Sequence, residues 1–218
     1  MLVSDIPEFK NYPRVLVFLA DHLSMQFGDV RSMLRLPLPN LGIEHACNFA
    51  SAATLCNLVS GISVSLFIPA VSTRVNRKGE QEWIGTGQAF RKLLKNFYPW
   101  ERCEDADESV RVLYDLVRNS FAHALGVHGK SGYQIGILRI STIGLSAEQL
   151  DEIERSPARP NWLSPGISGS GKAWKLLAEG FYRDVFHMLW NLARCDAQME
   201  EAEKRFSEGT IIWRSGKP

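Results

Sequence analysis

The sequence predicts an all-α fold, a helical bundle of about five long helices with a small β-hairpin insertion. Three observations predict it: apolar residues recur at helical spacing over long segments, prolines and glycines separate those segments, and only one short stretch alternates like a strand. A chain of 218 residues is long enough for one well-buried core. We therefore expect a single domain over 1–218, with 126–171 as an inserted loop and hairpin segment.

Each predicted long helix is bounded by residues that start or stop helices. Pro13 suits a first helical turn, and a helix is expected to end before Pro69 and before Pro99. Asn40 is a predicted N-cap, and Gly126 is a predicted stop. The predicted long helices span 13–27, 41–67, 89–98, 105–125 and 173–206.

The remaining segments are short or irregular. Residues 133–140 alternate loosely between glycines, which predicts a short strand or hairpin. Ser146 and Gln149 have the spacing of a capping box that opens a short helix. The polar stretch 71–81 and the Pro-, Gly- and Ser-rich stretch 157–171 are predicted as surface loops.

Composition restricts the functional classes. The net charge of +1 argues against a general polyanion binder, so any nucleic acid would have to contact a local basic patch. The four cysteines show no Cys-x-x-Cys spacing and are interpreted as free thiols of a reducing cytoplasm. The N-terminus lacks the pattern of a signal peptide. We expect a cytoplasmic protein with no metal ion and no cofactor.

One segment requires comparison with a membrane span. Residues 49–71 contain no charged residue, which is long enough to cross a bilayer. Asn57 and several serines interrupt the apolar run. We interpret it as the central, buried helix of a bundle and expect no membrane insertion, with the membrane span as the alternative.

The segment Arg118-Asn119-x-x-x-His123 is the one pattern that suggests chemistry. Asn119 and His123 are four residues apart on one helix face, so the amide can orient the imidazole. A guanidinium suits a phosphate, and a histidine suits proton transfer near neutral pH. Together these groups can cleave RNA without a metal ion, with the 2′-hydroxyl of the RNA as the nucleophile.

A structural explanation of the same residues stays open. Asp115 lies three residues before Arg118, and a surface ion pair between them would account for the arginine. A histidine near a helix end often caps carbonyl groups or packs against the fold.

The motif, late in a helix of a helical bundle, resembles the signature of the HEPN superfamily, an Arg and a polar residue followed by a His after four to six intervening residues. The resemblance implies a bundle that forms a homodimer and brings two motifs together. It also implies a metal-independent endoribonuclease, of toxin or defence-effector type, with Arg118, Asn119 and His123 as catalytic residues. For substrate binding we single out Arg111 and Lys130.

The alternative is a catalytically inactive HEPN-like interaction module that binds a partner protein such as an antitoxin. An enzyme requires the motif to face a solvent-reachable cleft. An interaction module would leave the same residues in ion pairs or packed away.

Two other patterns compete with the motif. Residues 166–173 differ by one residue from a phosphate-binding P-loop, because Ala173 replaces the Ser or Thr that would hold magnesium, and we interpret them as a loop before a helix. Arg183 and His187 form a second Arg/His pair, but their apolar neighbours predict a core histidine. The candidates for nucleic-acid contact are Arg74, Arg77, Lys78, Arg91, Lys92, Lys95, Arg111, Arg118, Lys130 and Arg139.

Overall fold

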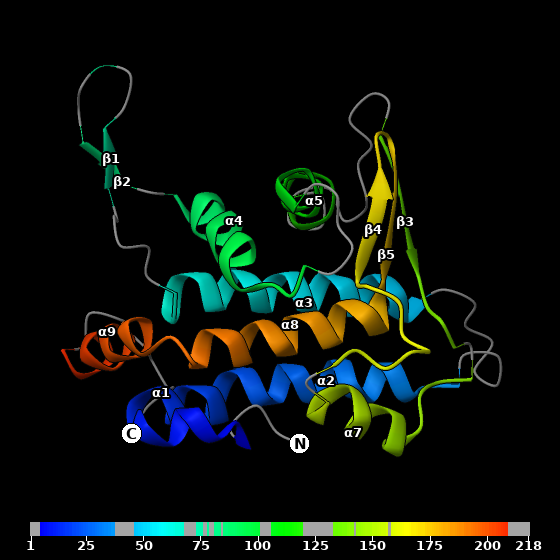
Figure 1. Ribbon diagram of the computed structural model, residues 1–218, viewed down its shortest axis with the longest axis horizontal. Coiled ribbons are helices and arrows are strands. Elements are labelled where there is room, and N and C mark those ends of the chain that lie inside the picture. Colours follow the sequence, from blue (N-terminus) through cyan, green and yellow to red (C-terminus); the bar gives the residue numbers. More distant parts are fainter. Residues whose placement is uncertain are drawn as a thin grey trace.

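The structure, a computed structural model, describes residues 5–37, 46–67, 73–75, 78, 81–83, 85–100, 106–119, 133–141, 143–156 and 158–208. These residues are mostly helical and include one small three-stranded sheet, which confirms the mainly helical fold class (Figure 1). The predicted N-cap Asn40 lies outside the described residues.

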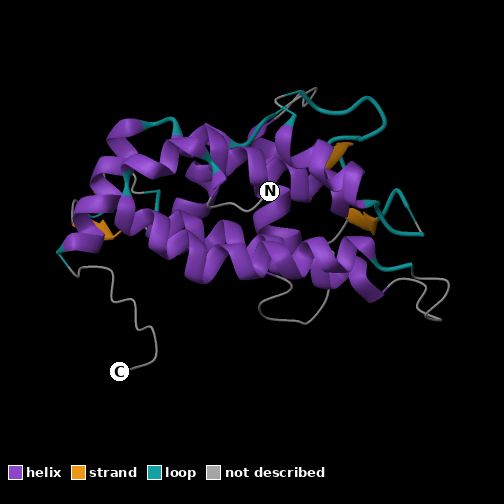
Figure 2. Cartoon of the chain, turned by 90° about the horizontal axis from the view of Figure 1, so that it is seen from below, coloured by secondary structure: helices purple, strands orange, loops and turns teal. Residues whose placement is uncertain are grey.

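Helix α8 (Ala178–Ala193) forms the centre of the molecule. It contacts α2 (Ser24–Arg35), α3 (Ala46–Ser65), α4 (Thr86–Phe97), α7 (Ala147–Arg155) and α9 (Asp196–Ser207). Nearly all of its residues are buried, because its apolar side chains are distributed around most of the helix. In Figure 1, α2 lies below α8 and α3 lies above it, and Figure 2 shows the long helices running along the long axis of the molecule.

The first helix is longer than predicted. Helix α1 (Pro13–Phe18), the π-helical turn η3 (Leu19–Leu23) and α2 follow one another without interruption, after the 3-10 turn η2 (Pro7–Asn11). The helix continues past residue 27 because Val30 and Leu34 extend its buried face. Its start is capped from the far end of the chain, since the Glu203 carboxylate accepts the backbone N–H of Arg14 at 3.1 Å and that of Val15 at 3.0 Å.

Helix α4 and helix α5 (Ala106–Val112) lie above α3 in Figure 1. Helix α4 buries Phe90, Leu93 and Leu94 and ends before Pro99 as expected. Ser146 opens α7 with the predicted capping box, accepting the Gln149 N–H at 3.2 Å and donating its own N–H to the Gln149 side chain at 2.9 Å.

The sheet differs from the predicted hairpin. Strand β3 (Gln134–Leu138) pairs in parallel with β5 (Ala173–Leu177), and β4 (Ile167–Ser170) pairs antiparallel with the other edge of β5. The predicted helix over 173–206 is therefore wrong in its first turn, and it breaks again between α8 and α9. The reason is period-two burial: Trp174 and Leu176 face inward, whereas Lys175 faces solvent.

A second departure lies in the stretch predicted as a loop over 71–81. Strands β1 (Thr73–Val75) and β2 (Gln81–Trp83) form an antiparallel pair there, with Thr73 opposite Trp83.

One described helix is long and apolar enough to cross a membrane, the stretch Cys47–Ser65 of α3. Half of that stretch is buried inside the protein, where α3 packs on α2, α4 and α8.

Candidate functional site

The motif arginine, Arg118, lies at the end of a π-helical turn that continues helix α5. The α-helical hydrogen bonds of Ala106–Val112 give way to η5 (Leu113–Arg118), in which the i→i+5 pattern widens the helix. Leu113, Leu116 and Val117 are buried, so the turn is fixed to the core on one side. Such turns are common at functional sites, but η3 is a second one, so the turn alone identifies nothing.

Arg118 is half-buried and held by neutral groups. Its Nη1 donates to the Asn119 side-chain oxygen at 3.0 Å, and its Nε donates to the Ser60 hydroxyl of α3 at 3.4 Å. Its guanidinium carbon lies 5.6 Å from the centre of the Tyr114 ring. Arg118 and Asn119 therefore converge, as the spacing of the motif predicts.

The ion pair proposed as the structural explanation of Arg118 is not formed. Asp115 pairs instead with Arg91 of α4, with 3.0 Å between the carboxylate oxygen and Nη2. Among the described residues, Arg118 makes no ion pair with any carboxylate. A guanidinium that has only neutral partners keeps its positive charge available to an anion such as a phosphate.

The thiol of Cys56 lies one turn before Ser60 on α3 and is affected by the charge of Arg118. Burial raises the pKa of the Cys56 thiol to about 12, and the positive charge of Arg118 acts in the opposite direction. The thiol is buried and protonated over the physiological range, so it is not a nucleophile there.

Tyr114 links Arg118 to helix α4. The Arg91 guanidinium carbon lies 4.3 Å from the ring centre of Tyr114, and that of Arg118 lies 5.6 Å from it. Gly87 of α4 makes this possible, because a Cβ at that position would collide with the Tyr114 hydroxyl. The ring therefore has an arginine from each of two helices against it.

A groove lies between α4 and the helix α5–η5. Its volume is about 360 Å³ and four cationic side chains line it with two carboxylates. We call it the α4/α5 groove; its lining residues are Gln88, Arg91, Lys92, Lys95, Asp107, Val110, Arg111 and Asp115.

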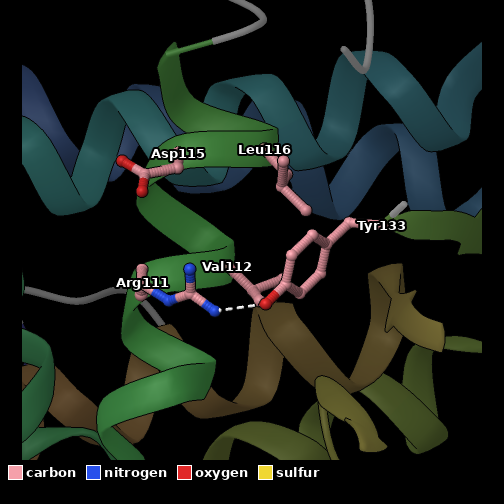
Figure 3. A pocket seen from close by; sticks show the side chains of 5 residues that line it. All are labelled: Arg111, Val112, Asp115, Leu116 and Tyr133. Atoms are coloured by element: carbon pink, nitrogen blue, oxygen red, sulfur yellow. Dashed lines mark hydrogen bonds between the residues drawn. The ribbon is translucent and has the colours of Figure 1, made fainter. Parts of the chain in front are cut away.

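A smaller pocket shares Arg111 and Asp115 with this groove (Figure 3). Val112 and Leu116 point toward the ring of Tyr133, and Arg111 donates to the Tyr133 hydroxyl at 2.6 Å. The predicted substrate-binding residue Arg111 is thus half-exposed and borders both cavities. Arg118 lines neither of them.

His123 and Lys130 lie outside the described residues, as does Arg77. The geometry therefore covers Arg111, Arg118 and Asn119 of the predicted set.

Arg139, a candidate for nucleic-acid contact, serves the fold instead. Its side chain is 2% exposed and its Nε lies 3.4 Å from the carboxylate of Glu179, which is 0% exposed. The guanidinium also donates to the backbone oxygens of Met33 and Leu34 at the end of α2. The prediction for Arg139 is wrong because its neighbours in space, not in sequence, neutralise it.

The competing patterns are also structural. His187 is buried, with Nε2 3.3 Å from the Ile153 oxygen, and Arg183 is buried beside Asp184, which confirms the core interpretation. The segment resembling a P-loop forms the β4–β5 hairpin, in which Gly171 adopts a φ of 57° at the turn. A strand, not a helix, follows the glycines directly, so the prediction of a loop before a helix is wrong. The segment also lacks the helix N-terminus that a P-loop uses to bind phosphate.

Tyr114, Ser60 and Gly87 are site residues that the sequence did not reveal. The four-residue spacing of Tyr114 and Arg118 was a usable signal. Ser60 and Gly87 lie on other helices, and no local pattern connects them to Arg118.

Among the described residues, no group of three or more His, Cys, Asp and Glu side chains has the arrangement of a metal site. Comparisons of the chain with family models, curated proteins and solved structures returned no match.

Proposed function

We propose that this protein is a HEPN-like, metal-independent endoribonuclease of the toxin or defence-effector type. The observation that carries the proposal is the environment of Arg118, a half-buried guanidinium held by Ser60 and Asn119 without a carboxylate partner among the described residues. A buried or half-buried arginine that serves only the fold is normally neutralised, as Arg139 is by Glu179.

The proposed reaction is transesterification within the RNA. The 2′-hydroxyl attacks the adjacent phosphorus and loses its proton, and the 5′-oxygen leaves and gains one, which yields a 2′,3′-cyclic phosphate. Arg118 stabilises the charge that develops on the phosphoryl oxygens, and Asn119 holds the guanidinium in place. His123 transfers a proton to or from the reacting oxygens.

The proposal includes the assembly that the resemblance implies. The helices would form a HEPN-like bundle of about five long helices, with the segment around β3 and β4 as an insertion. Two copies would pair as a homodimer and bring their motifs to one cleft. An antitoxin or another partner protein would regulate it, and the protein would act in the cytoplasm.

The test is cleavage of a mixed-sequence RNA in the presence of EDTA. We expect the wild-type protein to produce 2′,3′-cyclic phosphate ends. Arg118→Ala and His123→Ala should each reduce the rate by about 10²–10³-fold or more. Arg194→Ala is the matched control, because this exposed arginine lies at the end of α8 and pairs with Glu8.

Circular dichroism and gel filtration would show that each variant is folded and has the same oligomeric state as the wild type. No cleavage by folded wild-type protein across varied RNAs would overturn the nuclease and favour the catalytically inactive interaction module. Equal loss in Arg194→Ala would show that the effect does not come from the motif.

A further inference from the structure

We infer that the α4/α5 groove binds the phosphate backbone of single-stranded RNA and leads the strand toward Arg118. This inference rests on the proposed function and names where its substrate lies. It adds a binding site on one protomer, outside the Arg118–Asn119 motif.

The groove concentrates positive charge in a chain that is nearly neutral. The whole protein carries a net charge of +1, whereas the groove presents four cations against two carboxylates. Arg91, Lys92 and Lys95 come from one face of α4, and Arg111 comes from α5 on the opposite wall. Local concentration of this kind is what a protein of low net charge needs to bind a polyanion.

The ion pairs within the groove are weak enough to yield to phosphate. Lys95 and Asp107 are 2.8 Å apart, but their side chains are 58% and 71% exposed. Arg91 and Asp115 form the second pair across the groove, and Arg111 pairs with Glu108 of α5 at 3.2 Å. Exposed pairs of this type are screened by water and salt and contribute little to folding. Lys92 has no partner among the described residues.

The groove is linked to the motif arginine through one side chain, Tyr114. Arg111 and Asp115 of the helix α5–η5 line the groove, whereas Arg118 lies three residues further along η5 and outside its lining. Arg91 and Arg118 lie against the same Tyr114 ring. A strand held by Arg91 of α4 is therefore separated from the Arg118 guanidinium by the Tyr114 ring.

The dimensions favour one strand over a duplex. The α4/α5 groove has a volume of about 360 Å³, which can take one backbone but not a duplex. Lysine and arginine contacts with phosphates carry no sequence information, and we expect little sequence preference in binding.

The experiment separates binding from cleavage. A fluorescein-labelled 12-nucleotide RNA with 2′-O-methyl groups has no nucleophile, and its binding is followed by fluorescence anisotropy between 50 and 300 mM salt. For a single strand, the slope of log K against log salt is about −0.7 per phosphate contacted, so four contacts give about −3.

The triple variant Arg91→Gln/Lys92→Gln/Lys95→Gln removes three of those contacts. We expect the slope to become shallower by about 2 and the affinity at 100 mM salt to fall at least about 10-fold. Lys204→Gln is the matched control for Lys95→Gln, because Lys204 is 64% exposed, also faces a carboxylate, and lies on α9. The control should leave both values unchanged.

The outcomes distinguish this inference from the proposed function. Unchanged binding in a folded triple variant, or the absence of salt-dependent binding by wild type, would overturn the groove. Loss of binding in the triple variant supports the groove even if unmodified RNA is never cleaved, a result that would overturn only the nuclease. Cleavage of normal RNA with full efficiency by the triple variant would support the nuclease and overturn the groove.

Discussion

The protein uses arginine in two opposite ways in two neighbouring regions. Around the central helix α8, buried arginines face buried carboxylates: Arg139 contacts Glu179, and Arg159 lies 2.8 Å from Asp184. Around η5, Arg118 is half-buried and, within the part of the chain that the structure describes, bonds to the neutral side chains of Ser60 and Asn119.

The difference is whether a carboxylate of the fold neutralises the arginine or leaves its positive charge available to a ligand. The carboxylate of Asp184 also accepts hydrogen bonds from the Tyr98 hydroxyl at 2.8 Å and the Gly166 N–H at 2.9 Å. Neighbours within the fold therefore satisfy this carboxylate. Burial raises the pKa of Asp184, while the charges of Arg159 and Arg183 and these hydrogen bonds act to lower it. Among the described residues, no carboxylate neutralises Arg118 in this way. We therefore propose that Arg118 binds an anionic ligand and does not serve the fold alone.

The largest expected effect is on the α8 side. Arg139→Met leaves the Glu179 carboxylate buried without its cation and should lower the free energy of unfolding by about 3–5 kcal/mol. Arg118→Met should lower it less, by about 1–3 kcal/mol, because two hydrogen bonds of a charged group are lost but no buried carboxylate among the described residues loses its cation. Urea unfolding measures both values.

The double variant Arg139→Met/Glu179→Gln is the control. It should recover part of the stability that Arg139→Met loses, because no unpaired charge remains. If Arg118→Met destabilises the protein as much as Arg139→Met, Arg118 is a structural arginine and the comparison fails.

The second-largest expected effect is the change in the free energy of unfolding with pH that the Cys56 thiol causes. The unfolded Cys56 thiol has a pKa near 9, whereas in the folded protein it is about 12, so the folded state retains the proton longer. The stability contributed by the neutral thiol is fully present below pH 9 and is lost as the pH rises toward 12, by about 1.4 kcal/mol per pH unit. Urea unfolding at pH 8 to 10.5 measures this slope.

Cys56→Ala identifies the contribution of the thiol. The variant loses stability at pH 8 through the cavity it creates, but its stability should fall less steeply above pH 9. Burial also raises the pKa values of Tyr98 and Tyr182, so some alkaline destabilisation should remain. An unchanged slope in Cys56→Ala would contradict the buried thiol.

A smaller effect tests how Tyr114 positions the motif. Gly87→Ala should displace the Tyr114 ring and with it the contact to Arg118, reducing RNA cleavage by about 10-fold. Gly28→Ala in α2 is the matched control, since nothing lies within 4 Å of its added Cβ. It should leave cleavage unchanged and raise the free energy of unfolding by about 0.5–1 kcal/mol. Equal cleavage by both variants would show that the ring does not position Arg118.

The smallest effect concerns the exposed pair across the groove. Asp115→Asn should change the free energy of unfolding by no more than about 1 kcal/mol, because exposed ion pairs contribute little. The same variant should bind the 2′-O-methyl RNA more tightly, since Arg91 is released. A loss of several kcal/mol would instead show that the pair stabilises the fold, as Arg139 and Glu179 do.

Local sequence rules located several features correctly. The capping box at Ser146 and the end of α4 before Pro99 follow from neighbours within one helical turn. The adjacency of Arg118 and Asn119 was predictable for the same reason.

The errors arise where distant segments decide. Strand β5 forms because β3 and β4 pair with both of its edges, and neither partner could be identified from residues 173–177 alone. Its Trp174 and Leu176 fit a strand or a helix until that pairing exists.

The mainly helical class and the motif at Arg118 could be identified from residue spacing, because spacing along a helix fixes which residues share a face. The carboxylate that each arginine contacts could be identified only from the folded chain. Asp115 is three residues from Arg118 but pairs with Arg91, while Glu179 is 40 residues from Arg139 and neutralises it. Charge pairing depends on distance in space, and folding brings together groups that no local pattern connects.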